Sequence, residues 1–180
     1  MSTTAAPMTV DEFLKLPEVE GEKRELIHGE VASMAYAGFL HERVKSNLNK
    51  ILVVWLDRHP SGQVFLETTY RMDGEEALAP DLSVLRNERL APVTKDLPVG
   101  APDLAIEVVS SETAARLRTK IRLYLKFGSR AVWVVYPDER IIEVHRAIDQ
   151  VTILGPNQIL EDPDALPGFS TPVSAIFEGL

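Results

Sequence analysis

The sequence predicts a mixed α/β fold in which a central β-sheet is flanked by helices. Two continuous apolar runs, at 104–109 and 131–136, are typical of strands covered on both faces. The segment at 112–127 has apolar residues at helical spacing, with a serine pair at 110–111 as its expected cap and Gly128 as its terminator. Strand, helix and strand in that order, with alternating segments before and after, indicate a mixed sheet with helices packed on it.

The N-terminal segment begins with a helix-start signal. Thr9 and Glu12 have the spacing of a capping box, which predicts a short helix that ends before Pro17. A length of 180 residues is typical of one domain, which we expect at 9–180 after a loose tail at 1–8.

Periodicity predicts the remaining elements. Apolar residues three and four apart predict a helix of about five turns at 39–58. Alternating or apolar stretches bounded by turn residues predict further strands, at 24–27, 30–35, 63–72, 79–85, 140–145 and 150–154. Proline-rich stretches predict loops at 86–101 and 162–169, and a short terminal helix is expected at 173–177.

Composition excludes several classes of protein. Apolar residues make up 45% of the chain and charged residues 26%, as in ordinary globular proteins. No apolar run approaches the ~20 residues of a membrane span, and the start of the chain lacks the pattern of a signal peptide. The absence of cysteine excludes disulfides, thiolate metal sites and a thiol nucleophile. We therefore expect a cytoplasmic protein without a membrane partner.

The net charge of −8 argues against nonspecific binding to nucleic acid. The segment 113–137, however, contains no acidic residue and carries several basic ones, namely Arg116, Arg118, Lys120, Arg122, Lys126 and Arg130. Local fields matter more for docking than total charge. This segment permits a polyanionic partner without requiring one, because a solvated helix face explains the outward basic residues equally well.

Two carboxylates indicate a candidate metal site. Glu107 lies inside an apolar run, and a buried carboxylate requires a cation, a proton or another partner. Asp81 follows Pro80 at the start of another predicted strand. If these strands are neighbours, both side chains can point to one end of the sheet. Such a hard, oxygen-lined site suits Mg²⁺, with Mn²⁺ as a substitute.

Lys120 is the basic residue best placed to reach this site. At 100° per residue it lies about 60° from Leu117, which belongs to the buried stripe of the predicted helix. Arg118 and Arg122 lie on the opposite, solvated side. A lysine beside the ion could orient an attacking water or stabilise the charge that develops on a phosphate.

A purely structural interpretation fits the same residues. Glu107 and Lys120 would then form a structural ion pair, and Asp81 would cap a backbone amide at the start of its strand. Asp103 also follows a proline and imitates the Pro-Asp pattern. It lies four residues from Glu107 on one strand, about 13 Å away, which is too far to share an ion.

Several motifs carry a family resemblance through their order and spacing. They are Arg-Glu-Leu-Ile-His-Gly-Glu at 24–30, His41, Pro-Asp-Leu-Ala-Ile-Glu-Val-Val-Ser at 102–110, Lys-Ile-Arg-Leu-Tyr at 120–124, Val-Trp-Val-Val at 132–135 and Leu-Pro-Gly-Phe at 166–169. With Pro-Asp at 80–81, they resemble the Uma family of restriction-endonuclease-like proteins in the PD-(D/E)XK nuclease superfamily.

The resemblance implies a restriction-endonuclease-like fold and Mg²⁺-dependent cleavage of phosphodiester bonds, with DNA as the expected substrate. It implies that Asp81 and Glu107 are metal ligands and that Lys120 is the catalytic lysine, supplied by the helix because Val109 holds the usual position. Arg116 departs from the pattern, since many relatives have an acidic residue there. A catalytically silent nuclease-fold protein that binds nucleic acid or a protein partner is the alternative.

Weaker candidates complete the prediction. Glu25 and Glu67 occupy strand positions with apolar neighbours, where they approach the metal or lie at a solvent edge, and His41 is expected as an accessory ligand, a surface residue or a cap. Nucleic-acid contacts are expected from Arg116, Arg118 and Arg122. A homodimer is expected because cleavage of both strands requires two sites.

Overall fold

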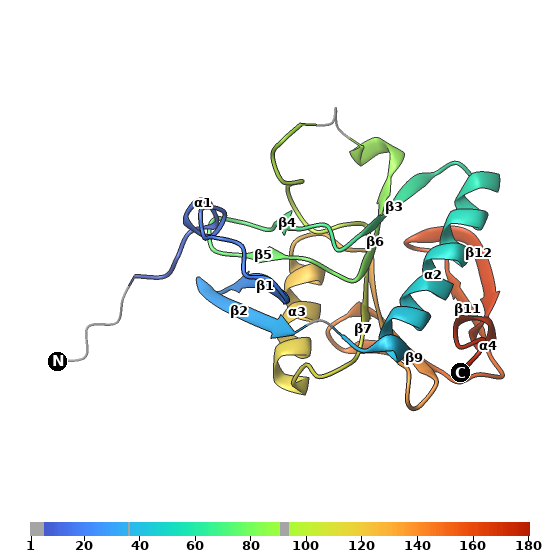
Figure 1. Cartoon of the computed structure of the whole chain (residues 1–180). Helices are drawn as coiled ribbons and strands as arrows, with labels where there is room; N and C mark the ends of the chain where they lie inside the picture. The colour runs from blue at the N-terminus through green and yellow to red at the C-terminus, as the bar shows by residue number, and fades with distance from the viewer. Residues whose placement is uncertain (1–5, 36, 91–93) are drawn as a thin grey trace.

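The computed structural model describes residues 6–35, 37–90 and 94–180. A six-stranded sheet with the order β10-β9-β8-β7-β6-β3 forms its centre (Figure 1). Its strands are β3 (Gly62–Leu66), β6 (Leu82–Arg86), β7 (Leu104–Val108), β8 (Ala131–Tyr136), β9 (Ile141–Ala147) and β10 (Gln150–Leu154). β7 and β8 pair in parallel, whereas the other described neighbours pair antiparallel. The prediction of a mixed sheet flanked by helices is confirmed.

In the described part of the chain, two smaller sheets and four α-helices surround this centre. A four-stranded sheet has the order β2-β1-β5-β4, and β11 pairs with β12 as a hairpin. These strands are β1 (Glu22–Ile27), β2 (Glu30–Ala35), β4 (Tyr70–Arg71), β5 (Ala77–Leu78), β11 (Ile159–Asp162) and β12 (Leu166–Pro172). The helices are α1 (Val10–Phe13), α2 (Phe39–Arg58), α3 (Ala114–Lys126) and α4 (Val173–Ile176), with a 3₁₀ turn at Asn87–Arg89. Within the described part of the chain, every helix is too short or too polar to cross a lipid bilayer.

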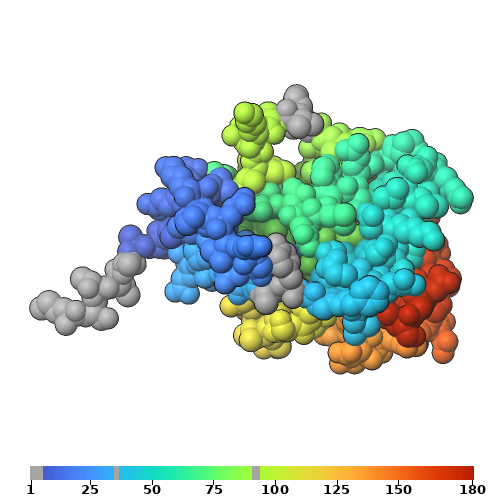
Figure 2. Space-filling model, in the orientation of Figure 1, coloured from blue at the N-terminus to red at the C-terminus, as the bar shows by residue number. Residues whose placement is uncertain are grey.

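The helices α2 and α3 cover opposite faces of the central sheet. Leu48 and Leu52 of α2 belong to one buried cluster together with Ile106 of β7, whereas Ile121 of α3 belongs to another with Ala105. Successive side chains of a strand point to opposite faces, so neighbouring β7 residues serve different cores. At the surface, α2 meets the C-terminal segment, whereas α3 lies below the N-terminal region (Figure 2).

The predicted start of the chain is only partly within the described residues. Residues 1–5 of the predicted tail lie outside them, whereas the backbone N–H of Met8 donates to the carbonyl of Gly29 at 3.0 Å. The predicted capping box is present, since Thr9 and Glu12 each accept a hydrogen bond from the backbone of the other. Residues 91–93 of the predicted loop also lie outside the described residues.

Two predicted strands are wrong as continuous elements. The strand predicted at 63–72 ends at Leu66, because Glu67 adopts a left-handed conformation with φ 48° and the chain leaves the central sheet before β4. The strand predicted at 79–85 begins only at Leu82, because residues 79–81 belong to no strand. Ala79 donates its backbone N–H to Glu25 at 2.9 Å, and Pro80 has no N–H for a ladder bond.

The predicted loop at 162–169 is also wrong, because β11 and β12 form a hairpin there. An irregular register beside Asp162 hides the alternation that would have indicated these strands. The cap of α3 differs too, since the Thr113 hydroxyl accepts from the backbone N–H of Arg116 at 3.3 Å. The later start leaves Glu112 outside the helix.

Candidate active site

Asp81, Glu107 and Lys120 line one pocket of about 60 Å³ at the end of β6 and β7. Leu82 pairs with Ile106 across the antiparallel strands, so the preceding residue, Asp81, lies opposite Glu107. The alternation of β7 directs Glu107 to the face covered by α3, from which Lys120 approaches. The structure therefore brings the three predicted site residues together, from two neighbouring strands and the following helix.

Lys120 is enclosed by carboxylates. Its Nζ lies 2.8 Å from Glu107 Oε1, 3.2 Å from Glu25 Oε2 and 3.9 Å from Glu112 Oε1, and its side chain is only 1% exposed. Burial by itself would lower the pKa of Lys120, but the charges of these three carboxylates outweigh burial and raise it. The amine is therefore protonated at neutral pH, and it points inward as the helical geometry predicts.

Glu107 is held between Lys120 and Tyr124. The Tyr124 hydroxyl donates to Glu107 Oε1 at 2.6 Å, beside the ammonium of Lys120. Burial raises the pKa of Glu107 to about 7, with a further increase from Asp81 and Glu25, while the positive charge of Lys120 opposes the change. Glu107 thus exchanges a proton near neutral pH, whereas Lys120 keeps its own.

Asp81 has a different environment and stays ionised. Its Oδ2 accepts from the backbone N–H of Val108 at 2.8 Å and lies 3.2 Å from His41 Nε2, while its Oδ1 lies 3.2 Å from Lys23 Nζ. Burial alone would raise the pKa of Asp81. The hydrogen bond with His41 and the charge of Lys23 outweigh burial and hold this pKa well below its usual range.

Of the three accessory candidates, Glu25 and His41 are buried in contact with the predicted site residues. Glu25 is fully buried, so the solvent-edge alternative is wrong for this residue. One of its oxygens pairs with Lys120, and the other accepts from the backbone N–H of Ala79. His41 is also buried, with Nδ1 3.3 Å from Glu42 and Nε2 directed at Asp81, so it is not a surface residue. Burial would lower the pKa of His41, but the bond and charge of Asp81 raise it.

Glu67 is the accessory candidate that faces solvent. It lies at the left-handed turn after β3, and its carboxylate pairs with Lys45 Nζ at 2.6 Å while remaining 44% exposed. Lys45 also pairs with Glu42 at 2.7 Å, so one lysine links two acidic residues that line the pocket, Glu42 and Glu67. Asp103 is not a pocket residue. It is buried at the other end of β7, where it accepts from the backbone N–H of Arg86 at 3.0 Å.

Sequence reasoning missed three residues of the site: Lys23, Glu112 and Tyr124. Alternation on a strand places Lys23 on the same face as Glu25, and helical spacing places Tyr124 one turn after Lys120, so both carried a usable signal. Glu112 did not, because its approach to Lys120 depends on where α3 begins.

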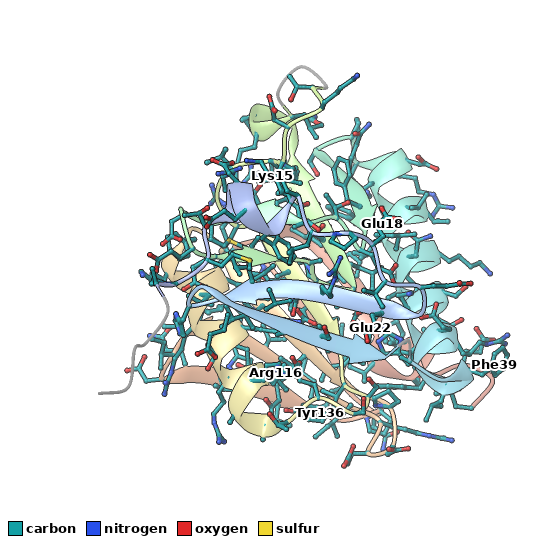
Figure 3. All side chains as sticks on the ribbon, turned by 60° about the vertical axis from the view of Figure 1, so that its left-hand side comes forward. Lys15, Glu18, Glu22, Phe39, Arg116 and Tyr136 are labelled. Carbon is teal, nitrogen blue, oxygen red and sulfur yellow. The ribbon has the colours of Figure 1, made fainter. Side chains whose placement is uncertain are left out.

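The predicted nucleic-acid-binding arginines lie on α3 outside the pocket lining. Arg118 and Arg122 are exposed, and Arg116 is half-buried on α3 below the β1–β2 hairpin (Figure 3). Burial raises the pKa of Glu112 overall, although the positive charge of Arg116 opposes this change. Contacts of these arginines with nucleic acid stay a prediction.

The donor set suits a hard divalent cation. Among the described residues, no three acidic or histidine side chains form a metal-binding group, so an ion held by Asp81 and Glu107 would need further oxygen ligands from outside the protein. Mg²⁺ typically takes one or two carboxylates and completes its shell with water and substrate oxygens. Glu25 Oε2 and Glu112 Oε1 are buried without a hydrogen bond, and both face the ammonium of Lys120, at 3.2 and 3.9 Å.

Comparisons with known proteins decide the family. The model of the Uma2 family, described as "Putative restriction endonuclease", matches residues 10–174. The chain belongs to the Uma2 family. The predicted resemblance is therefore confirmed, and with it the restriction-endonuclease-like fold.

Two other proteins are similar to this chain. A crystal structure described as a putative nuclease belonging to DUF820, from Anabaena variabilis, has a TM-score of 0.83 and 25% identity, covering 95% of this chain and 98% of that one. The uncharacterized protein sll1609 of Synechocystis is 30% identical over 112 residues. That match spans 62% of this chain and 63% of the relative, which is less than two thirds of its length.

Proposed function

We propose that this protein is a Mg²⁺-dependent endonuclease that hydrolyses phosphodiester bonds in DNA. One observation carries the proposal: a fully buried ammonium, Lys120, lies beside Glu107, which is itself opposite Asp81 on the neighbouring strand, and all three residues line a single pocket. A buried charge is costly, and a merely structural pair does not need a second carboxylate from the neighbouring strand. Family membership supports the same reaction class.

The roles of the residues follow from their surroundings. Asp81 and Glu107 would hold the ion, which supplies Lewis acidity and a reactive water when bound. Lys120 keeps its proton and can donate a hydrogen bond to negative charge that develops on a phosphate oxygen. Tyr124 orients Glu107 through its 2.6 Å hydrogen bond, and His41 holds Asp81 in its ionised form.

Cleavage of supercoiled plasmid DNA tests this proposal. Cleavage is expected with Mg²⁺ or Mn²⁺ and is expected to stop when EDTA is added. Lys120→Met and Asp81→Asn should each reduce the rate at least about 100-fold, as expected when charge stabilisation is lost. Lys50→Met is the matched control, because Lys50 is exposed on α2 and outside the pocket lining. Metal-independent cleavage, or undiminished cleavage by Asp81→Asn, would contradict the proposal.

A catalytically silent nuclease-fold protein is the second candidate. The observation that favours it is that both carboxylates already face ammonium groups, Asp81 that of Lys23 and Glu107 that of Lys120. This candidate predicts DNA binding in a gel-shift assay, without Mn²⁺ binding in calorimetry and without cleavage. The endonuclease proposal predicts all three signals.

Two further predictions belong to the proposal. Cleavage of both DNA strands requires two active sites, so a homodimer is expected in sedimentation equilibrium. A cytoplasmic location is expected because the substrate is DNA. A monomer that makes only single-strand nicks would remove the dimer from the proposal and leave the chemistry in place.

A further inference from the structure

A second ammonium reaches the pocket from outside the central sheet. Lys23 Nζ lies 3.2 Å from Asp81 Oδ1, and the Lys23 side chain is 19% exposed, compared with 1% for Lys120. The proposed mechanism does not use this lysine. Its position is nevertheless fixed by the fold, because β1 presents Lys23 and Glu25 on one face, two residues apart.

The hairpin of β1 and β2 carries Lys23 to Asp81. Lys23 pairs with Met34 across the hairpin, and both residues line the pocket. In Figure 3 this hairpin lies in front of α3, and Glu22, the first residue of β1, lies towards the α2 side of the molecule. The next residue, Lys23, pairs with one oxygen of Asp81, and His41 lies against the other.

The two lysines differ in how firmly they are held. Lys120 has three carboxylates within 3.9 Å of its Nζ. Among the described residues, only Asp81 lies within ion-pair distance of Lys23. A long, partly exposed lysine can move its charged end to solvent at little cost, whereas a buried lysine in a carboxylate cage cannot. Lys23 is therefore the displaceable cation of the pair.

We propose that Lys23 forms an ion pair with Asp81 in the metal-free protein, in the place that a divalent ion takes when it binds. Lys23 then moves to a phosphate oxygen of DNA. This inference rests on the proposed function, because it assigns Asp81 to the ion. The ammonium and the ion compete for the same carboxylate, so Lys23 weakens ion binding in the absence of DNA. DNA, by engaging Lys23, should in turn strengthen ion binding, and the coupling is reciprocal.

Replacing Lys23 by methionine tests this proposal, because methionine keeps much of the apolar stem and removes the charge. Calorimetric titration with MnCl₂ should show about tenfold or tighter binding in Lys23→Met than in the wild type, as removal of a competing charge predicts. The affinity of Lys23→Met for a short DNA duplex in CaCl₂ should be lower than that of the wild type. The slope of log affinity against log salt should decrease by the amount expected for about one phosphate contact. A merely structural lysine would weaken both, so changes in opposite directions identify the exchange.

Two matched variants complete the experiment. Lys23→Arg keeps the charge and should restore Mn²⁺ and DNA affinities close to those of the wild type, and Lys50→Met should change neither. Circular dichroism of each variant checks that it is folded. Tighter Mn²⁺ binding by Lys23→Met should disappear when Asp81→Asn is added, because the carboxylate for which the ion and the ammonium compete is then absent.

The outcomes separate this inference from the proposed function. Mn²⁺ binding that depends on Asp81 but is unchanged or weaker in Lys23→Met overturns the role of Lys23 and leaves the endonuclease proposal intact. Binding in Lys23→Met but not in the wild type supports the role of Lys23. An absence of Mn²⁺ binding in both proteins overturns both proposals.

Discussion

The two faces of the central sheet are both buried, yet they differ in the charge that they bury. On the α2 face, Ile106 and Trp133 pack in an apolar cluster, and the buried carboxylate of Asp162 accepts a hydrogen bond from Trp133 Nε1. On the α3 face, which we call the charged face, Glu107 lies on the same side of the strand as Ala105. Its carboxylate contacts Lys120 and the hydroxyl of Tyr124. One strand thus contributes to an apolar core and to a charged pocket, and a shift of one residue would exchange them.

The difference shows what burial of charge demands. The α2 face, which is largely apolar, depends mainly on volume and shape, and its apolar residues tolerate similar substitutes. The charged face requires every partner, because one ammonium balances Glu107 and Glu25 while Tyr124 occupies a remaining oxygen lone pair. Removal of one group from such a network leaves others buried and unpaired. The stability of the charged face should therefore depend on complete pairing more than on packing.

The largest effect on the free energy of unfolding is expected from Lys120→Met, which removes the buried ammonium of the charged face and keeps an apolar stem. Glu25, Glu107 and Glu112 would lose their common cation, and we expect a loss of about 3–5 kcal/mol in the free energy of unfolding. Urea unfolding at pH 7 measures it. A loss below about 1 kcal/mol would show that the three carboxylates do not depend on Lys120.

The α2 face is tested at the neighbouring residue. Ile106→Ala should lower the free energy of unfolding by about 2–4 kcal/mol, because it leaves a cavity in a fully buried cluster. DNA cleavage per folded molecule should stay close to that of the wild type. If Ile106→Ala abolished cleavage in the folded fraction, the two faces would not be separable.

Glu107→Gln should change how stability depends on pH. The folded pKa of Glu107, about 7, lies above its ordinary value of 4.5, so between these values the unfolded chain releases a proton that the folded protein keeps. The free energy of unfolding therefore falls as pH rises through this range. Glutamine cannot ionise, so this fall should be smaller in the variant, by about 2 kcal/mol. Urea unfolding of both proteins at pH 5 and pH 8 gives the difference.

The sign of this change decides the outcome. If the stability of the wild type, relative to Glu107→Gln, rose between pH 5 and pH 8, the pairing with Lys120 would outweigh burial. The pKa of Glu107 would then be lowered. The comparison of the two faces would need correction, because ionisation of Glu107 would stabilise the charged face.

The smallest effect on stability is expected outside the pocket. Replacing Arg118 and Arg122 together by glutamine should change the free energy of unfolding by less than about 0.5 kcal/mol, because both side chains are exposed. If these residues contact DNA, the slope of log affinity against log salt should decrease by about two phosphate contacts. An unchanged slope would assign them to a solvated helix face.

Much of the charged face could be predicted from the sequence because it depends on local periodicity. Apolar neighbours predicted burial of Glu107, and helical angles predicted that Lys120 points inward, as the structure shows. Alternation indicates that Lys23 shares a face with Glu25, but its contact with Asp81 could not be derived from periodicity. It depends on how a second sheet packs against the first, and this packing involves residues distant in sequence.

The fold shows the same limit. Continuous apolar strands at β7 and β8 were predicted, since burial on both faces leaves a clear pattern. The exit of the chain from the central sheet at Glu67 was missed, because a left-handed residue other than glycine leaves no signal in periodicity. The β11–β12 hairpin was missed because its buried Asp162, which accepts from Trp133 Nε1 at 2.7 Å, resembles a polar loop residue.

The central claim is that Asp81 and Glu107 together bind one divalent ion. The most direct measurement is the anomalous difference map of a crystal soaked in MnCl₂. The account predicts one peak within about 2.0–2.3 Å of an oxygen of each carboxylate, the usual range for such ions, with Lys23 moved away from Asp81. A map with no peak there, and with both lysine ion pairs unchanged, would contradict it.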